Sequence, residues 1–358
     1  MSKVFPIALI LFVAACGTSP QQLALHYNEG TQVRFSGSTL TTREGVKFAT
    51  DEWQFWYANG ELQARGNYEA GGLPSLDAID ATSTDIPRVG RSGNWSFWND
   101  AGQLMEVGSY VSGSKEGEWK TFFPDGSVRS EGRFHEGQAQ GMHTRWFHGG
   151  QLQSEIHYAR GLREGLASEW NGQGQLLRRG RYLADQRVGK HAIWNEEGQK
   201  IEEAMYVDGF LHGERRTWDE EGCLAWAANY EWGVQEGNFL LYFPSGALRQ
   251  QGVFENGQQV GMLSAYYDGG FCEWEFQFEN GEQEGRRSFW YPNGQQRTEG
   301  RYQGGVPVGR HQEWYPSGNR KSVGSYRAGR PIGNWHSWHP DGTRDESLSG
   351  NFSPGSGR

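Results

Sequence analysis

The residues that could carry chemistry are scattered along the chain. His336 and His339 are three residues apart, which places them on opposite faces of a strand, so we expect no shared metal ion. The acidic pairs Glu196-Glu197 and Glu220-Glu221 fall at expected turns, where carboxylates are solvated. Gly172-Gln173-Gly174 also falls at an expected hairpin turn, so it does not predict a phosphate loop.

Motifs of known catalytic sites are missing from the chain as well. There is no His-Glu-x-x-His, no paired Cys-x-x-Cys and no Gly-x-Ser-x-Gly. No residue is placed as a nucleophile or as a general acid or base. We therefore expect a protein that is not an enzyme and that needs neither a metal nor a cofactor.

A strict internal repeat organises the chain instead. Eleven glycines, from Gly93 to Gly333, follow one another every 24 residues without an insertion, and an earlier copy fits residues 51 to 74. We number each repeat from this marker glycine as position zero. Position five is always aromatic: Trp56, Trp98, Phe122, Trp146, Trp170, Trp194, Trp218, Tyr242, Tyr266, Trp290, Trp314 and Trp338. A fixed period of this length indicates a repeat architecture, which usually offers a long surface rather than a catalytic pocket.

The turn residues show what each repeat forms. Pro124-Asp125-Gly126 and Pro292-Asn293-Gly294 suit a type I turn followed by a glycine in the left-handed region, which closes a three-residue hairpin loop. The flanking segments are short and rich in aromatic residues, as strands are, and no helical apolar pattern follows the N-terminal region. We predict an all-β fold in which tandem 24-residue β-hairpin repeats form an elongated, twisted antiparallel sheet.

Strand alternation then predicts two faces. In a three-residue hairpin, position five lies opposite position eleven, and positions eleven, fifteen and seventeen share its face. We expect the position-five aromatics to pack on this face, and a stacking ladder for sugar rings or an extended polypeptide is the alternative. Position two is expected to face away. Trp95, Trp119 and Trp335 are therefore the candidate interaction surface.

The N-terminus predicts a lipid anchor. Lys3 precedes an apolar stretch that is too short to cross a bilayer and ends in Val13-Ala14-Ala15-Cys16-Gly17. This resembles a bacterial lipobox, which implies signal-peptide cleavage and lipidation of Cys16, for example with palmitate. Gly17 in place of aspartate implies the outer membrane of a Gram-negative cell envelope. A plain secretory signal is the alternative.

Six segments follow from these patterns. We expect a signal peptide at 1–15, a lipidated Cys16 and tether at 16–26, a capping hairpin at 27–50, the repeat array at 51–350 and a flexible tail at 351–358. An insertion at 75–92 carries Asp77, Asp80 and Asp85 without the spacing of a calcium loop, so we interpret it as a solvated loop. Cys223 and Cys272 are two repeats, or about 19 Å, apart, which is too far for a disulfide.

The segment Gly117 to Gly137 resembles the bacterial MORN-repeat variant found in proteins labelled YwqK-type antitoxins. Its turn, aromatics and glycines all match that pattern, and the likeness extends over residues 51 to about 350. The resemblance implies a β-hairpin array with an interaction role. The last copy departs from the pattern at Leu348 and Gly350.

Net charge narrows the choice of partner. The chain carries a formal charge of −9 and no basic stripe, which argues against nucleic acid. We expect a non-enzymatic envelope lipoprotein that acts as a protein-interaction scaffold and meets the membrane through its lipid. A carbohydrate- or peptidoglycan-binding module and an antitoxin- or immunity-like protein are the alternatives, and the partner is an unknown envelope protein or glycan.

Overall fold

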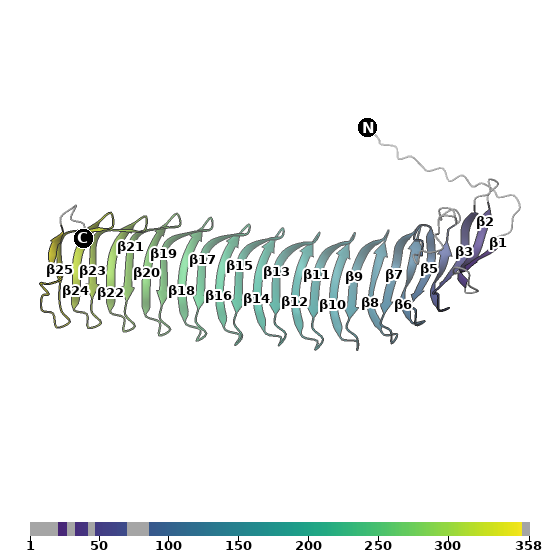
Figure 1. The fold of residues 1–358 in the computed structure, drawn as a ribbon, viewed down its shortest axis with the longest axis horizontal. Helices are drawn as coiled ribbons and strands as arrows, with labels where there is room; N and C mark the ends of the chain where they lie inside the picture. The colour runs from purple at the N-terminus through teal and green to yellow at the C-terminus, as the bar shows by residue number, and fades with distance from the viewer. Residues whose placement is uncertain (1–20, 27–32, 42–46, 70–85, 353–358) are drawn as a thin grey trace, which may run out of the picture. The chain divides into compact units, whose positions relative to one another are not determined.

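The computed structural model describes residues 21–26, 33–41, 47–69 and 86–352. Every regular element in these ranges is a β-strand, and each repeat is one hairpin, which confirms the predicted fold class. The chain divides into two compact units, Met1–Gly165 with Gly172–Gly174, and Leu166–Asn171 with Gln175–Arg358. We call them unit 1 and unit 2 and describe each separately. In each unit the strands lie side by side in one layer (Figure 1).

Unit 1 contains ten strands, each of which pairs antiparallel with the next along the chain. They are β1 (Gln21–His26), β2 (Val33–Thr41), β3 (Lys47–Trp56), β4 (Leu62–Tyr68), β5 (Arg91–Trp98), β6 (Leu104–Val111), β7 (Ser114–Phe122), β8 (Val128–His135), β9 (Gln138–Trp146) and β10 (Leu152–Ala159). Strand β11 (Leu162–Trp170) has residues in both units. Residues 21–26, which were expected to belong to the tether, form β1 instead.

Unit 2 continues the same antiparallel pairing of consecutive strands. Its strands are β12 (Leu176–Leu183), β13 (Gln186–Trp194), β14 (Lys200–Val207), β15 (Phe210–Trp218), β16 (Leu224–Glu231), β17 (Val234–Tyr242), β18 (Leu248–Glu255), β19 (Gln258–Tyr266), β20 (Cys272–Glu279), β21 (Glu282–Trp290), β22 (Gln296–Gln303), β23 (Val306–Trp314), β24 (Arg320–Arg327), β25 (Arg330–Ser337) and β26 (Gly350–Phe352). Asn351 and Phe352, expected in the tail, belong to β26.

Two kinds of turn alternate along both units. The first is the predicted three-residue loop: Phe123 N donates to Ser127 O, and Gly126 has a φ of 85°. The second joins one repeat to the next through two residues with positive φ, such as Ser112 at 47° and Gly113 at 80°. Positive φ at both central residues defines a type I′ turn, whose twist matches that of the flanking strands.

A β-bulge, present in each repeat hairpin whose strand register is described, overturns the predicted faces. Trp98 pairs with Leu104, as expected, but Phe97 pairs with Glu106, so Met105 has no partner. The extra residue at position twelve reverses the alternation, because positions eleven and thirteen then face opposite sides. Positions five and eleven therefore lie on one face, and positions two, fifteen and seventeen lie on the other. The expectation that positions five, fifteen and seventeen share a face was wrong.

The marker glycines have a backbone reason to recur. All eleven have φ between 62° and 107°, a region that side chains with a Cβ rarely adopt. Each lies beside a second register shift, where position fifteen of the preceding repeat has no single partner. This local bend places the position-two ring of one repeat over the position-fifteen residue of the repeat before it.

The core of unit 1 is built from this contact. A Cβ on Gly66 would lie 2.1 Å from Cδ2 of Trp95, and one on Gly108 would lie 2.1 Å from Cδ2 of Trp119. The indole Nε1 of Trp95 also donates to the carbonyl oxygen of Asn67 at 3.1 Å. Phe35, Trp53, Tyr68 and Tyr110 complete a buried aromatic cluster with these rings.

Histidines take the same position in later repeats. The imidazole of His143 covers Gly132 with its Nε2 2.8 Å from the carbonyl oxygen of Arg133, and His191 covers Gly180 in the same way. The carbonyl accepts, so the ring nitrogen must carry the proton. Tryptophan and histidine are thus interchangeable here because each supplies a flat ring and a donor at its far end.

Candidate functional site

The predicted interaction surface is not exposed. Trp95 and Trp119 have exposed fractions of only 1% and 3%, and Trp335 is half-buried against Gly324. The physical reason is the bulge at position twelve, which puts position two on the covered face. The prediction of exposed contacts at these tryptophans was therefore wrong. The indole Nε1 of Trp335 is buried without a hydrogen-bond partner among the described residues, unlike those of Trp95 and Trp119.

The position-five aromatics line the opposite face. All twelve are half-buried, so they are neither sealed in a core nor fully exposed. Basic side chains lie over several of the rings: Lys200 Nζ is 5.9 Å from the Trp194 ring and 5.5 Å from the Trp218 ring. The rings on this face are therefore partly covered by side chains of adjacent strands.

The described residues contain no group of three or more His, Cys, Asp or Glu side chains that could hold a metal ion. His336 lies against Trp338, and His339 Nδ1 is 3.9 Å from a carboxylate oxygen of Asp345. Within the same ranges, no helix is long and apolar enough to cross a membrane. The lipobox residues, including Cys16, lie outside the described residues.

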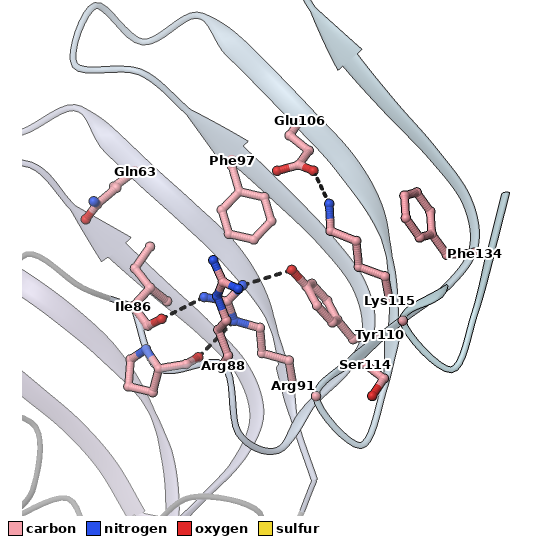
Figure 2. A pocket seen from close by; sticks show the side chains of 13 residues that line it. Gln63, Ile86, Arg88, Arg91, Phe97, Glu106, Tyr110, Ser114, Lys115 and Phe134 are labelled. Atoms are coloured by element: carbon pink, nitrogen blue, oxygen red, sulfur yellow. Dashed lines mark hydrogen bonds and ion pairs between the residues drawn. The ribbon is translucent and has the colours of Figure 1, made fainter. Parts of the chain in front are cut away.

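A cavity of about 1060 Å³ opens in unit 1 (Figure 2). Its wall combines cationic and aromatic side chains from β5, β6, β7 and β8 with the segment just before β5. These residues are Gln63, Ile86, Pro87, Arg88, Arg91, Phe97, Glu106, Tyr110, Gly113, Ser114, Lys115, Phe134 and Gly137. The cavity was not foreseen from the sequence.

Arg91 is fixed at the base of this cavity. Its guanidinium donates to the carbonyl oxygens of Ile86 and Pro87, both at 2.8 Å, and to the hydroxyl of Tyr110 at 3.1 Å (Figure 2). It also lies 4.6 Å from the ring of Trp95, and its exposed fraction is 4%. None of these partners is a carboxylate.

Burial keeps the two phenols near Arg91 protonated. It raises the pKa of Tyr110, and it raises the pKa of Tyr68, whose hydroxyl donates to Pro87 O at 2.7 Å. Nearby Arg91 opposes both shifts without reversing them. The phenols therefore stay neutral at physiological pH and do not balance the charge of Arg91.

Lys115 and Glu106, two other charged residues of the wall, form an ion pair with each other. Lys115 Nζ lies 2.5 Å from a carboxylate oxygen of Glu106, and the ammonium also lies 3.8 Å from the ring of Trp119. Arg88 is exposed and makes no ion pair with any described residue.

The cavity lies where the repeat period is interrupted. Residues 86–92, the described part of the predicted insertion, pack on the sheet, because Ile86 contacts the aromatic core and Gly90 and Arg91 are buried. The prediction of a solvated loop was wrong for this part, and residues 70–85 lie outside the described residues. A break in an otherwise strict period was the available signal, because departures from local regularity are expected at functional sites.

Comparison with known proteins agrees with the hairpin geometry. Residues 52–70 and 115–136 match the family model described as MORN repeat variant. Both matched segments lie in unit 1, and each includes a three-residue loop and the aromatic and glycine positions described above. No curated protein matches the chain.

Solved structures give only weak likenesses to these repeats. The crystal structure of TcdB2-TccC3 is 12% identical and covers 86% of this chain with a TM-score of 0.18. The Photorhabdus luminescens Tc holotoxin pore is 11% identical and covers 87% of this chain with a TM-score of 0.18. This chain spans 19% of the length of each of those chains. Such scores support no conclusion about this protein.

Unit 2 presents an apolar cluster at the type I′ turns between its repeats. Val207 and Phe210 pair across one turn, and Trp232 and Val234 lie at the next turn. Their exposed fractions are 37%, 55%, 53% and 46%. Phe210 reaches across to Gly233, whose Cβ would lie 3.6 Å from its ring. We call these four residues the turn cluster.

Trp232 stands out within the turn cluster because of its backbone. It has a φ of 49°, in the left-handed region, and the equivalent left-handed turn position of other repeats holds Asp208, Asn256 and Asn280 as well as the longer side chains of Glu136 and Arg160. Its ring rests edge-on against His212 at 5.0 Å. A large side chain in this region costs free energy relative to asparagine, and Trp232 also exposes an aromatic ring there, which together point to a role other than stability.

Proposed function

We propose that this protein is a non-enzymatic lipoprotein of the bacterial cell envelope whose repeats serve as a scaffold for protein–protein interaction, with the turn cluster as a contact surface. The observation that carries the proposal is the exposed, strained Trp232 beside exposed Phe210. Monomeric proteins rarely expose adjoining large apolar side chains without a use for them, and tryptophan is enriched where proteins bind one another.

The charges around the turn cluster describe its partner. Asp208, Glu231 and Glu255 are exposed at the same row of turns. Exposed Arg187 also adjoins the first of these turns, because Gly209 N donates to its carbonyl oxygen, but the carboxylates outnumber it. An apolar contact flanked mainly by carboxylates favours a partner segment in which apolar residues are flanked by lysine or arginine. The same carboxylates disfavour an anionic membrane surface as the occupant.

The anchor is proposed from the sequence. The lipobox around Cys16 supports lipidation, and Gly17 supports the outer membrane of a Gram-negative envelope. Mass spectrometry of the protein from its native membranes should find an acylated Cys16 at the N-terminus. A Cys16→Ser variant should lose the lipid and leave the membrane fraction, and membrane retention of an unmodified Cys16→Ser chain would contradict the anchor.

The scaffold role is tested by cross-linking in the intact envelope. A photo-reactive phenylalanine analogue at Phe210 should capture one recurrent protein through a segment that is apolar and basic. The analogue at Gln258, the same turn position two repeats later, is the control. Capture that is equal at both positions would contradict the proposed surface. Recurrent glycan at Phe210 without protein would favour a carbohydrate-binding module instead.

A further inference from the structure

The geometry points to the unit 1 cavity as a binding site for an anionic ligand that carries an oxyanion, a carboxylate or phosphate monoester, on a ring. This site is separate from the turn cluster of unit 2 and does not depend on the scaffold role. The cavity combines an excess of cationic side chains with an aromatic lining (Figure 2).

Charge balance is the first step. Among the described residues, the wall carries three cations, Arg88, Arg91 and Lys115, and one carboxylate, Glu106, which is paired with Lys115. Arg91 is held by carbonyl and phenol oxygens, which are neutral, and Arg88 has no carboxylate among the described residues. The described part of the wall therefore has an excess of two positive charges in a chain whose formal net charge is −9. A buried charge without a counter-ion is costly, and a bound anion would remove that cost.

Pre-organisation is the second step. The three hydrogen bonds of Arg91 fix its guanidinium in place, and Arg88 lies three residues away in the chain at the same cavity. Guanidinium groups match the geometry of carboxylates and phosphates, which accept two parallel hydrogen bonds from one fork. A fixed arginine beside an unpaired one suits an oxyanion better than a metal or a neutral polar group.

The lining defines the rest of the ligand. Phe97, Tyr110 and Phe134 line the same cavity, and the guanidinium of Arg91 lies 5.1 Å from the Phe97 ring. Apolar and aromatic walls with a few fixed polar groups are typical of small-molecule sites. The cavity volume of about 1060 Å³ leaves room for a ring in addition to the anionic group.

Calorimetry on the full mature chain tests this site with four probes. Phenyl phosphate and hippurate carry a ring with a phosphate or a carboxylate, inorganic phosphate lacks the ring, and benzyl alcohol lacks the charge. We expect saturable one-to-one binding of phenyl phosphate or hippurate, weakened at high salt. Which of the two binds more tightly identifies the oxyanion. Inorganic phosphate and benzyl alcohol should bind at least about tenfold more weakly than the better ring probe, because each lacks one half of the recognised group.

Substitutions complete the test. Arg88→Gln should weaken binding of the better probe by about tenfold or more, because it removes a charge-assisted hydrogen bond. The control is Arg330→Gln, which removes an exposed arginine of unit 2 and places there the residue found at the same repeat position in Gln138. It should bind like the unsubstituted chain.

Three results would overturn the proposal. They are absence of saturable binding by both ring probes, equal binding by the Arg88→Gln and Arg330→Gln proteins, and binding of benzyl alcohol or inorganic phosphate as tight as that of the ring probes. A thermal melt of each variant shows whether the fold is intact. Loss of the turn-cluster partner would leave all of these results unchanged.

Discussion

Replacing Trp232 with asparagine should separate binding from stability. Asn256 and Asn280 already occupy this turn position in later repeats, and asparagine tolerates the left-handed backbone that Trp232 adopts. Relief of left-handed strain should return about 1 kcal/mol to the folded state. Loss of the ring contact with His212 should cost a similar ~0.5–1.5 kcal/mol. The free energy of unfolding should therefore change by less than about 1 kcal/mol.

Binding should change much more. The ring of Trp232 is 53% exposed, so a partner that covers it would remove roughly 100 Å² of apolar surface from water. At about 25 cal/mol per Å², that surface contributes roughly 2.5 kcal/mol to the complex. The Trp232→Asn protein should therefore bind the captured partner about 70-fold more weakly.

The assay is urea unfolding for stability and calorimetry for affinity. The control is Ala328→Asn, at the same turn position and also at positive φ but outside the turn cluster. Equal affinity of the two variants would refute the reasoning about the contact surface. A loss of more than about 2 kcal/mol of stability in Trp232→Asn would instead show that the ring belongs to the fold.

Three further predictions concern the core and the buried titratable groups. Gly66→Ala should cost about 1–3 kcal/mol in urea unfolding because the new methyl meets the Trp95 ring, whereas Gly172→Ala, with nothing within 4 Å, should be neutral. Burial lowers the pKa of His143 in the folded state, so the stability contributed by the neutral ring is complete above the unfolded-state pKa and is lost as the pH falls through the folded-state pKa. The melting temperature of the unsubstituted protein should therefore fall more steeply over this pH range than that of the His143→Trp protein, which lacks the titrating group. Burial also raises the pKa of the Cys272 thiol to about 11, so iodoacetamide at neutral pH should label it more slowly than in the urea-unfolded chain, and equal rates would refute this.

The repeat and its turns were predictable because both depend on local chemistry. The glycine of each three-residue loop and the aromatic at position five follow from the period, and the pairing of Trp98 with Leu104 was predicted correctly. The faces were not predictable from the same pattern. Met105 has no feature that marks a bulge, yet this one unpaired residue decides which aromatics are covered.

The binding surfaces were harder to predict for a different reason. The cavity depends on Arg91 meeting the carbonyl oxygens of Ile86 and Pro87, and backbone acceptors leave no trace in a sequence. Trp232 did carry a signal, since it replaces the asparagine, aspartate or glycine that a type I′ turn favours. Periodicity reveals what repeats share, whereas both candidate sites arise where one repeat differs from the others.

The ring at position two covers the glycine at position fifteen of the repeat before it, so this contact always runs from a later repeat to an earlier one. Where position fifteen is glycine and position two of the next repeat is a ring, as for Gly132 and His143 in unit 1 or Gly180 and His191 in unit 2, the earlier hairpin leaves bare backbone on its C-terminal side and the later hairpin covers it. Within unit 2, the last such ring, Trp335 over Gly324, is met by Phe352 of β26. A gene that gains or loses one whole 24-residue period inside unit 2 would therefore keep each position-two side chain over a position-fifteen residue, provided that this final strand stays in place. Copy number can then change during evolution while this packing relation is kept, whereas a frame shifted by a few residues would leave one position-fifteen residue uncovered.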